Sequence, residues 1–410
     1  MQNIHNRTSP SQKINIGFVG LGYRAEFAIT RFRFIPQARI SGLCDINPSQ
    51  CLKISAQLSS HGYKHVKCYD DYREMLTDPD IDLIYISTPW HTHARIAIDA
   101  MNAGKHTAIE VPAAMTISEC EELVSVSEKT GRQCSILENC CYDEFTLATQ
   151  NMIQDGLFGE IYHCEGAYIH RLCERMIGTN SDFHKEWMPQ AYMSMNGNIY
   201  PTHGFGPIAM AMNINRGDRI KRINSVSSKP RVYNEYVKET FGKDVAFKLG
   251  DVSSSIITTE SGKIIELQFD IASPRPYNRK NLVVGTNGMF HKYPTEEIAL
   301  KPDYHQYITP KEREKLLNKY MHPVIIESSP LFQKIDIEAV RKKGILDYAM
   351  DYRLVKNLTE GKSADLDVYD AATWSCIVEL SALSASQNGT PVDIPDFTNG
   401  LWRKERISFQ

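Results

Sequence analysis

Short apolar runs alternate with segments of helical periodicity along the first third of the chain. The runs predict buried strands, and the segments with apolar residues three and four apart predict helices. Strands are expected at residues 14–19, 38–44, 66–69, 83–87, 106–110 and 133–137, with helices from residue 25, over 93–103 and over 118–129, where Gly131 is the expected stop. Repeated strand–helix–strand order is typical of a doubly wound parallel sheet, which binds ligands at the carboxyl ends of its strands.

From about residue 139 the pattern changes to longer β-rich runs. A helix is predicted over 144–154, strands over 160–171, 221–227, 252–271 and 282–292, and helices again over 348–358 and 371–386. The segment Glu260-Ser261-Gly262-Lys263 divides the third run and has the composition of a hairpin turn. The expected fold class is α/β + α+β. A doubly wound domain covers 1–140, and 141–410 form an α+β substrate-binding and oligomerisation domain with an open, mostly antiparallel β-sheet.

Composition places the chain among globular proteins. Its 410 residues are 42% hydrophobic, enough to build two or three domains and too apolar for a disordered chain. The 46 basic residues against 49 acidic ones argue against nucleic-acid binding, because phosphate contacts require a basic face. The ten cysteines include no CxxC pair, and we expect reduced thiols rather than a disulfide framework.

The distribution of apolar residues also predicts the location of the protein. No apolar run is as long as a membrane-spanning helix requires, so no such segment and no membrane partner is expected. The polar stretch 1–13 lacks the apolar core of a signal peptide. A cytoplasmic protein is therefore expected, although a processed precursor would show the same sequence.

The turn after the first strand carries candidate chemistry. Gly20-Leu21-Gly22-Tyr23-Arg24-Ala25 follows a strand and opens a helix, which is the G-x-G-x-x-A form of the Rossmann fingerprint. Asp45 ends the second strand, where a carboxylate accepts the ribose hydroxyls of NAD and repels the extra phosphate of NADP. We expect an NAD-binding Rossmann domain; the alternative is a tight structural turn.

The segment 1–140 resembles the Gfo/Idh/MocA oxidoreductases. The motifs that carry this resemblance are the glycine turn, Thr88-Pro89-Trp90-His91-Thr92-His93 and Glu110-Val111-Pro112. The usual members have lysine where this chain has Val111, and aspartate four residues before an active-site histidine, where this chain has Ile199. Two catalytic positions of an ordinary sugar dehydrogenase are therefore absent.

Further strings resemble glycoside hydrolase family 109, the NAD-dependent α-N-acetylgalactosaminidases. The similarity runs over about 14–292, and the segment 301–410 carries no usable motif. The strings are Glu110-Val111-Pro112-Ala113, Glu138-Asn139-Cys140-Cys141-Tyr142, Gly156-Leu157-Phe158-Gly159-Glu160, Tyr200-Pro201-Thr202-His203-Gly204, Asn213-Ile214-Asn215-Arg216-Gly217 and Ser273-Pro274-Arg275-Pro276-Tyr277-Asn278.

The resemblance implies site residues. With the glycine turn, the NAD site would consist of Gly20, Gly22, Tyr23, Arg24, Asp45, Trp90, His93, Glu110, Val111 and Asn139. The sugar would face Tyr168, Tyr200, Thr202, His203 and Tyr277, with catalysis by Tyr200, His203, Glu138 and Tyr168. The family has a Trp-Arg pair whose arginine contacts substrate, but here the pair is Trp187-Met188. No metal is predicted, because no third ligand is placed beside His91 and His93.

By that resemblance the chain is an NAD-dependent glycosidase acting with retention on an N-acetylhexosaminide, such as an α-N-acetylgalactosaminide. The implied reaction oxidises sugar C3 with tightly bound NAD, eliminates across C1 and C2, adds water and reduces C3 again, so that NAD is recycled. Tyr200 and His203 are predicted to share one face of a helical turn and to move protons at C3 and C2. Glu138 would assist the leaving group, and Tyr168 would orient the sugar.

Other interpretations stay open on the sequence alone. An NADH-releasing sugar dehydrogenase would use the same first domain, and a non-catalytic NAD or sugar sensor would fit the change at Met188. Tyr200, His203, Glu138, Trp90 and Tyr277 also fit packing, capping or turn roles, and residues 311–315 a solvated helix face. The expected partners are a small carbohydrate and further copies of the chain, bound through the C-terminal sheet.

Overall fold

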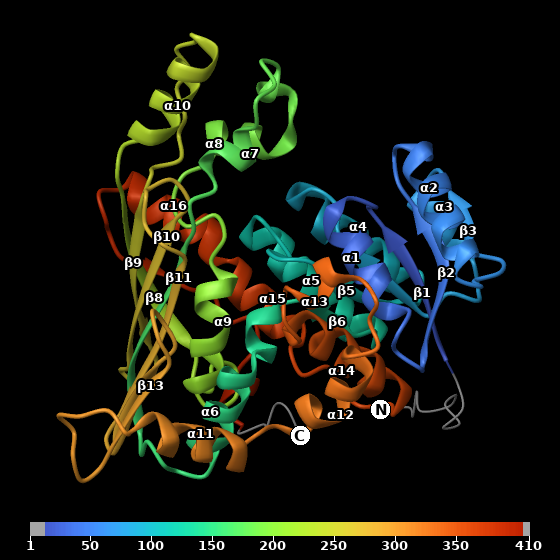
Figure 1. Cartoon of the computed structure of the whole chain (residues 1–410). Coiled ribbons are helices and arrows are strands. Elements are labelled where there is room, and N and C mark those ends of the chain that lie inside the picture. The colour runs from blue at the N-terminus through green and yellow to red at the C-terminus, as the bar shows by residue number, and fades with distance from the viewer. Residues whose placement is uncertain (1–12, 405–410) are drawn as a thin grey trace. The chain divides into compact units, whose positions relative to one another are not determined.

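The computed structural model describes residues 13–404 and divides them into two compact units (Figure 1). The first unit contains the described residues up to Glu144 together with 322–372, and the second contains 145–321 and the described residues from 373. The predicted boundary at residue 140 lies close to the first change of unit, but it did not anticipate that 322–372 belong with the N-terminal part. Almost all of the polar N-terminal stretch that was compared with signal peptides lies outside the described residues.

The first unit is built on a parallel six-stranded sheet of order β3-β2-β1-β4-β5-β6. This is the strand order of a Rossmann fold, in agreement with the doubly wound parallel sheet that the alternating pattern predicts. Strands are added to one side of β1 up to β3 and to the other side from β4 onward, and such sheets bind ligands at this switch between β1 and β4. The elements are β1 (Ile14–Val19), α1 (Tyr23–Phe32), β2 (Ala38–Cys44), α2 (Pro48–Ser60), β3 (Lys67–Tyr69), α3 (Tyr72–Thr77), β4 (Leu83–Ile86), α4 (Trp90–Asn102), β5 (His106–Ile109), α5 (Ile117–Thr130), β6 (Cys134–Ile136) and the 3-10 helix η1 (Asn139–Tyr142).

Local sequence accounts for these boundaries. The central strand β4 is buried at every position, as a strand covered on both faces should be. Helix α5 begins with a capping box between Thr116 and Glu119, and it ends at Gly131 in the left-handed conformation, as predicted.

Three helices from late in the chain complete the first unit: α12 (Pro323–Phe332), α13 (Glu338–Arg341) and α14 (Leu346–Thr359). Figure 1 shows α14, in orange, among the blue and teal elements of this unit. Helix α14 packs against α1, β1 and η1, so a late segment supports the cofactor-binding side of the sheet.

The second unit is built on an open eight-stranded sheet of order β13-β12-β11-β7-β10-β9-β8-β14. All strand pairs are antiparallel except β10 with β7, which confirms the predicted mostly antiparallel sheet. Its strands are β7 (Ile161–Ile169), β8 (Ile220–Ser227), β9 (Ser253–Thr259), β10 (Ile264–Asp270), β11 (Asn278–Gly285), β12 (Gly288–His291), β13 (Glu297–Leu300) and β14 (Val392–Asp393).

Helices cover this sheet on one face and extend from its ends. Helix α9 packs on β7, β10 and β11, and α16 packs on β8. The helical segments are α6 (Glu144–Gln154), α7 (Cys173–Ile177), η2 (Phe183–Lys185), α8 (Trp187–Ser194), α9 (Thr202–Ala211), α10 (Arg231–Phe241), α11 (Pro310–Lys319), α16 (Ile377–Ser386) and η3 (Leu401–Arg403). Helix α15 (Val368–Ser375) begins in the first unit and ends in the second. None of the described side chains of α11 is buried, which confirms a solvated helix over 311–315.

Some elements differ from prediction. The run 282–292 is a hairpin of β11 and β12 rather than one strand, and the helix predicted over 371–386 is broken at Cys376 into α15 and α16. Cys51 of α2 and Cys68 of β3 form a disulfide with Cα atoms 6.0 Å apart, so the expectation of reduced thiols was wrong for this pair. Within residues 13–404, no helix has the length and apolar character needed to cross a membrane.

Candidate active site

The loop between β1 and α1 has the geometry of a dinucleotide-binding turn. Gly20 has a φ of +83°, and a Cβ there would lie 2.7 Å from the Ser87 carbonyl oxygen, so only glycine fits this close approach to the end of β4. Gly22 is the N-cap of α1, and a Cβ there would meet nothing within 4 Å. Ala25 is fully buried, as a small third residue should be. The open space at Gly22 and the helix N-terminus fit a pyrophosphate.

Asp45 lies at the end of β2, where the ribose carboxylate was predicted. Its Oδ2 accepts the Leu21 N–H at 2.7 Å, and its Oδ1 accepts the Asn47 N–H at 2.8 Å. These bonds tie the carboxylate to the glycine turn and to the start of α2. Each carboxylate oxygen retains a second lone pair, so Asp45 can also accept ribose hydroxyls.

Arg24, Glu110 and Asn139, predicted to line the NAD site, are brought together in the first unit. The Arg24 Nε donates to Glu110 Oε1 at 3.0 Å, and the Tyr85 hydroxyl donates to the same oxygen at 3.2 Å. The Asn139 amide donates to Asp347 of α14 at 2.8 Å. Arg24 also lies 3.6 Å from Asp347, so residues from α1, η1 and α14 and the residue after β5 form one polar cluster.

The remaining predicted NAD residues differ in exposure. Tyr23 is 52% exposed and packs its ring on Phe27 at 4.6 Å, whereas Trp90 and Val111 are buried. His93 is buried, and its two ring nitrogens lie 2.8 Å from the Pro112 carbonyl oxygen and 2.7 Å from that of Thr88. Burial lowers the pKa of His93, so the ring is neutral and donates from one nitrogen to one of these two carbonyl oxygens, which holds it between the two loops.

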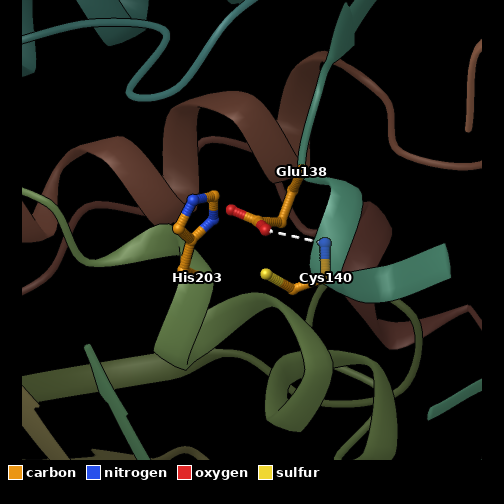
Figure 2. Close-up of side chains that lie close together, drawn as sticks. All are labelled: Glu138, Cys140 and His203. Carbon is orange, nitrogen blue, oxygen red and sulfur yellow. Dashed lines mark hydrogen bonds between the residues drawn. The ribbon is translucent and has the colours of Figure 1, made fainter. Parts of the chain in front are cut away.

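Glu138 is fully buried and caps η1. Its Oε1 accepts the Cys140 N–H at 3.0 Å, the dashed line in Figure 2. The structure thus shows the capping role that the sequence left open beside a catalytic one. Figure 2 also shows His203 on the first turn of α9.

In the second unit, the predicted sugar-facing aromatic residues form one cluster. The His203 ring lies edge-on to both Tyr200, with centroids 4.9 Å apart, and Tyr168, with centroids 5.2 Å apart. Tyr200 precedes the first residue of α9, so the two residues are neighbours without sharing a helical face. The rings come from the end of β7 and the start of α9, which places titratable groups beside aromatic surface.

Close backbone packing produces this cluster. A Cβ on Gly166 of β7 would lie 2.1 Å from the Gly204 carbonyl oxygen, and a Cβ on Gly204 of α9 would lie 2.6 Å from the Ala167 nitrogen. Only two glycines allow strand and helix to approach this closely. Tyr168 and His203 adjoin these contacts in sequence and so come within ring contact.

Tyr277 lies in a loop held by a buried carboxylate. Asp270, 1% exposed, accepts the Ser273 N–H at 2.9 Å and the Arg275 Nε–H at 2.9 Å. Tyr277 is 43% exposed, with its ring centroid 6.4 Å from that of Tyr168. It is therefore well placed to present its ring to a ligand of the cluster.

Thr202 and Met188, the other two positions considered for substrate binding, lie outside the aromatic cluster. Thr202 is fully buried, and its hydroxyl has no hydrogen-bond partner within the part of the chain that the structure describes, so its predicted contact with the sugar stays a prediction. Met188, at the start of α8, is half-buried and supplies no charge at the position where the resemblance implied a substrate-binding arginine.

His170 also belongs to this cluster, although no sequence motif predicted it. Its Nδ1 lies 3.3 Å from the Tyr168 hydroxyl, and its ring centroid lies 4.9 Å from that of Tyr277. Burial, Arg175 and His203 lower the pKa of His170, which favours the neutral imidazole that can accept a proton from the phenol in a hydrogen bond. The two-residue spacing from Tyr168 was the available signal, because alternate strand residues share a face.

Comparison with known proteins extends these observations to both units. Residues 14–137 match the oxidoreductase family model with an NAD-binding Rossmann fold. Residues 142–404, more than half of the chain, match the model described as glycosyl hydrolase 109, C-terminal domain. The chain belongs to glycosyl hydrolase family 109. The C-terminal match means that the family resemblance, predicted to stop near 292, continues through the last helices.

Relatives of this family 109 protein are similar over nearly their whole length. An α-N-acetylgalactosaminidase of Bacteroides fragilis is 42% identical over 97% of this chain and 95% of its own length. A glycosyl hydrolase family 109 protein of Phocaeicola vulgatus is 39% identical over 98% of this chain and 99% of its own. The prediction of an NAD-dependent enzyme of the glycosidase class is confirmed, and NAD is its cofactor.

Solved structures share the fold of the family 109 chain. A levoglucosan dehydrogenase in complex with NADH and L-sorbose has a TM-score of 0.73 at 19% identity, covering 94% of this chain and all of the other. An inositol dehydrogenase homologue from Azotobacter vinelandii, complexed with NADH and myo-inositol, has a TM-score of 0.68 at 19% identity, covering 94% of this chain and 98% of the other. The likeness confirms the Gfo/Idh/MocA architecture.

Proposed function

We propose that this chain hydrolyses a terminal N-acetylhexosaminide, with α-N-acetylgalactosaminide as the first substrate to test. The observation that carries the proposal is the Tyr168–Tyr200–His203 cluster, which unites two phenols and an imidazole at one place in the second unit. The name of the Bacteroides fragilis relative supports the choice of sugar. Exposed aromatic surface at Tyr277 suits the apolar face of a pyranose.

The chain's own groups move protons in this reaction. NAD, which the glycine turn and Asp45 would hold tightly, would supply reversible two-electron chemistry at sugar C3 and would be unchanged overall after each turnover. Tyr200 and His203 take the protons of the C3 hydroxyl and of C2, which becomes acidic when C3 is a ketone. The C1–O bond then breaks, the departing oxygen is protonated, and water adds at C1 while C2 regains a proton.

Two further residues orient or assist. Tyr168, fixed by His170, directs its hydroxyl at the sugar. We assign protonation of the departing oxygen to Glu138, whose cap of η1 needs only an acceptor. Glu138→Gln keeps that acceptor and removes the acid, so we expect kcat to fall by about 10²–10⁴ with an unchanged melting temperature. Full activity of this variant on substrates with poor leaving groups would contradict the assignment.

The route is tested with aryl N-acetylhexosaminides in heavy water without added oxidant. We expect release of the phenol together with deuterium at C2 of the freed sugar, because the C2 proton exchanges before water adds. Release without deuterium would overturn the oxidation–elimination route. Steady NADH formation without phenol would identify a dehydrogenase, and binding of NAD and sugar without turnover a sensor.

The assigned residues are tested with Tyr200→Phe and His203→Ala. Each should abolish turnover while the protein keeps its bound NAD, since both residues lie in the second unit. Tyr162→Phe is the matched control, because Tyr162 is an exposed tyrosine on the same strand as Tyr168. Full activity of either test variant would overturn the role given to that residue.

The exposed face of the second sheet supports an oligomer. Val226, Ile256 and Ile264 are 58%, 52% and 46% exposed on neighbouring strands, and alternation places them on the face opposite the buried residues. We propose that this face pairs with another copy of the chain. Ile256→Lys should lower the mass measured by light scattering, whereas a monomeric wild type would contradict the proposal.

A further inference from the structure

Helix α14 carries a buried carboxylate into the polar cluster of the first unit. Asp347 is 3% exposed, and its Oδ1 accepts the Asn139 amide at 2.8 Å. The same oxygen lies 3.6 Å from a terminal nitrogen of Arg24, which also pairs with Glu110 at 2.9 Å. One side chain from α14 therefore contacts two of the residues assigned to the NAD site.

A second layer holds Asp347 in place. Arg31 of α1, fully enclosed by protein, lies with its Nη1 3.7 Å from Asp347 Oδ2 and donates through Nε to Asp351 at 2.6 Å. Asp351 lies one turn further along α14. The Arg31 guanidinium is thus fixed between two carboxylates of the same helix, and only Asp347 reaches onward to Arg24 and Asn139.

The charges of the cluster are unequal. Arg31 and Arg24 hold the pKa of Asp347 at about 2 in spite of its burial, so this carboxylate stays ionised. Burial raises the pKa of Asp351 to about 7, and the nearby Asp347 and Glu110 add to the rise. The two aspartates therefore differ: Asp347 stays an ionised acceptor, whereas burial shifts the pKa of Asp351 upward although Arg31 donates to it.

We propose that Asp347 is a positioning residue for NAD, acting through Asn139 and Arg24; the inference rests on the assignment of those two residues to the NAD site. A carboxylate accepts only from the NH2 end of the Asn139 amide, so Asp347 fixes which way that amide is turned and leaves its second N–H and its oxygen in set directions. Arg24, a third exposed, loses side-chain freedom when held by Glu110 and Asp347 together. Both groups are thus oriented before the cofactor arrives, which lowers the entropy lost on binding.

The test compares two isosteric changes on one helix. Asp347→Asn removes the charge that Asn139 and Arg24 contact. Asp351→Asn removes a carboxylate that contacts Arg31 but neither of those two residues. The holoenzyme is passed through a desalting column, and samples are taken at intervals afterwards. In each sample the NAD still bound per chain is released by heating the protein and is then measured. The melting temperature of each variant is recorded beside it.

We expect Asp347→Asn to lose NAD roughly 10–100-fold faster than wild type, the range for a hydrogen bond to a charged group. Asp351→Asn should lose NAD within about threefold of the wild-type rate, whatever its melting temperature. Equal rates of NAD loss in the two variants would overturn the inference and would show that Asp347 has only a structural role beside the arginines. Should Asp347→Asn fail to fold, Asp347→Glu keeps the charge and shifts it from the Asn139 amide, with the same expectation.

Asn139→Ala separates failure of this inference from failure of the NAD assignment. If Asn139→Ala releases NAD quickly and Asp347→Asn does not, the inference falls and the NAD site stands. If neither Asn139→Ala nor Arg24→Gln alters NAD retention, the assignment of these residues falls and the inference with it. A wild type that retains no NAD on the column would contradict tight binding and the inference together.

Discussion

At the scale of single residues, Gly20 and Gly22 have different roles although they are only two positions apart. Gly20 combines a positive φ with a backbone contact that leaves no room for a Cβ, whereas Gly22 opens onto empty space. The first therefore maintains the fold, and the second keeps a place for ligand. The fingerprint contains both, and only the structure separates their roles.

Substitution by alanine should separate these two roles. Gly20→Ala should lower the free energy of unfolding by roughly 1–3 kcal/mol, because alanine is strained at that φ and clashes with Ser87. Gly22→Ala should keep the wild-type melting temperature of the NAD-free protein but bind NAD at least about tenfold more weakly, since a methyl group would stand where the pyrophosphate approaches. Calorimetry measures the stability of each variant, and titration with NAD measures its affinity. Normal stability together with weak NAD binding in Gly20→Ala would contradict the separate roles of the two glycines.

Strand β7 and helix α9 approach each other closely at Gly166 and Gly204. The contact of Gly166 with Gly204 sets the distance between Tyr168 and His203, so packing of two elements fixes the geometry of the proposed catalytic groups. A change in this crossing should therefore affect stability and turnover together.

Gly166→Ala tests that link. The added Cβ would lie 2.1 Å from a backbone oxygen, which cannot rotate away, so α9 must shift. We expect a loss of at least about 1–3 kcal/mol of stability and a fall in kcat. Gly22→Ala, which inserts a methyl group into open space, is the control for stability in the NAD-free protein. An unchanged kcat in a folded Gly166→Ala protein would show that the crossing does not set the active geometry.

The start of β5 makes the first unit sensitive to acid. Burial and Arg132 lower the pKa of His106 to about 4, and its Nδ1 accepts the Gln133 N–H at 3.1 Å. Because the unfolded pKa is near 6.5, this contribution to stability is present above about pH 6.5 and is lost as the pH falls toward 4, up to roughly 3 kcal/mol. His106→Asn keeps the acceptor without titrating, so its unfolding free energy should depend less on pH over that range. Parallel curves for the two proteins would contradict this.

Sequence patterns predicted the helices and strands better than the turns and interruptions that divide them. The hairpin at residues 260–263 was predicted because polar turn residues separate two alternating segments. The β11–β12 turn was missed although Asn287-Gly288 is a hairpin signal, whereas the break at Cys376 has neither glycine nor proline to mark it. In the site, motifs predicted the glycine turn and the aromatic cluster. Asp347 carries no local signal, since its partner Asn139 is 208 positions away.

At the scale of the whole molecule, neither unit is a continuous stretch of chain. The first unit needs residues 322–372 to cover α1 and η1, and the second needs α16 to cover β8. A cofactor domain drawn as residues 1–140 would lack α14, and Arg31 would then lose both of its buried carboxylate partners. An unpaired buried charge is strongly destabilising.

This arrangement can be tested with fragments. Residues 13–144 alone should show helical circular dichroism without sharp thermal unfolding or NAD binding. The same fragment joined by a flexible linker to residues 322–372 should unfold cooperatively and bind NAD, because α14 restores the partners of Arg31 and Asn139. Cooperative unfolding of the short fragment would show that α14 is dispensable.

The late position of α14 has a consequence during synthesis. When η1 leaves the ribosome, the partners of Arg31 have not yet been translated, because the whole segment Phe145–Met321 comes first. At about 5–20 residues per second, the nascent cofactor unit waits roughly 10–45 s for α14 to be completed. Over that interval its incomplete surface is open to chaperones and proteases, so the pace of translation through the second sheet governs how long the NAD-binding half stays unfinished.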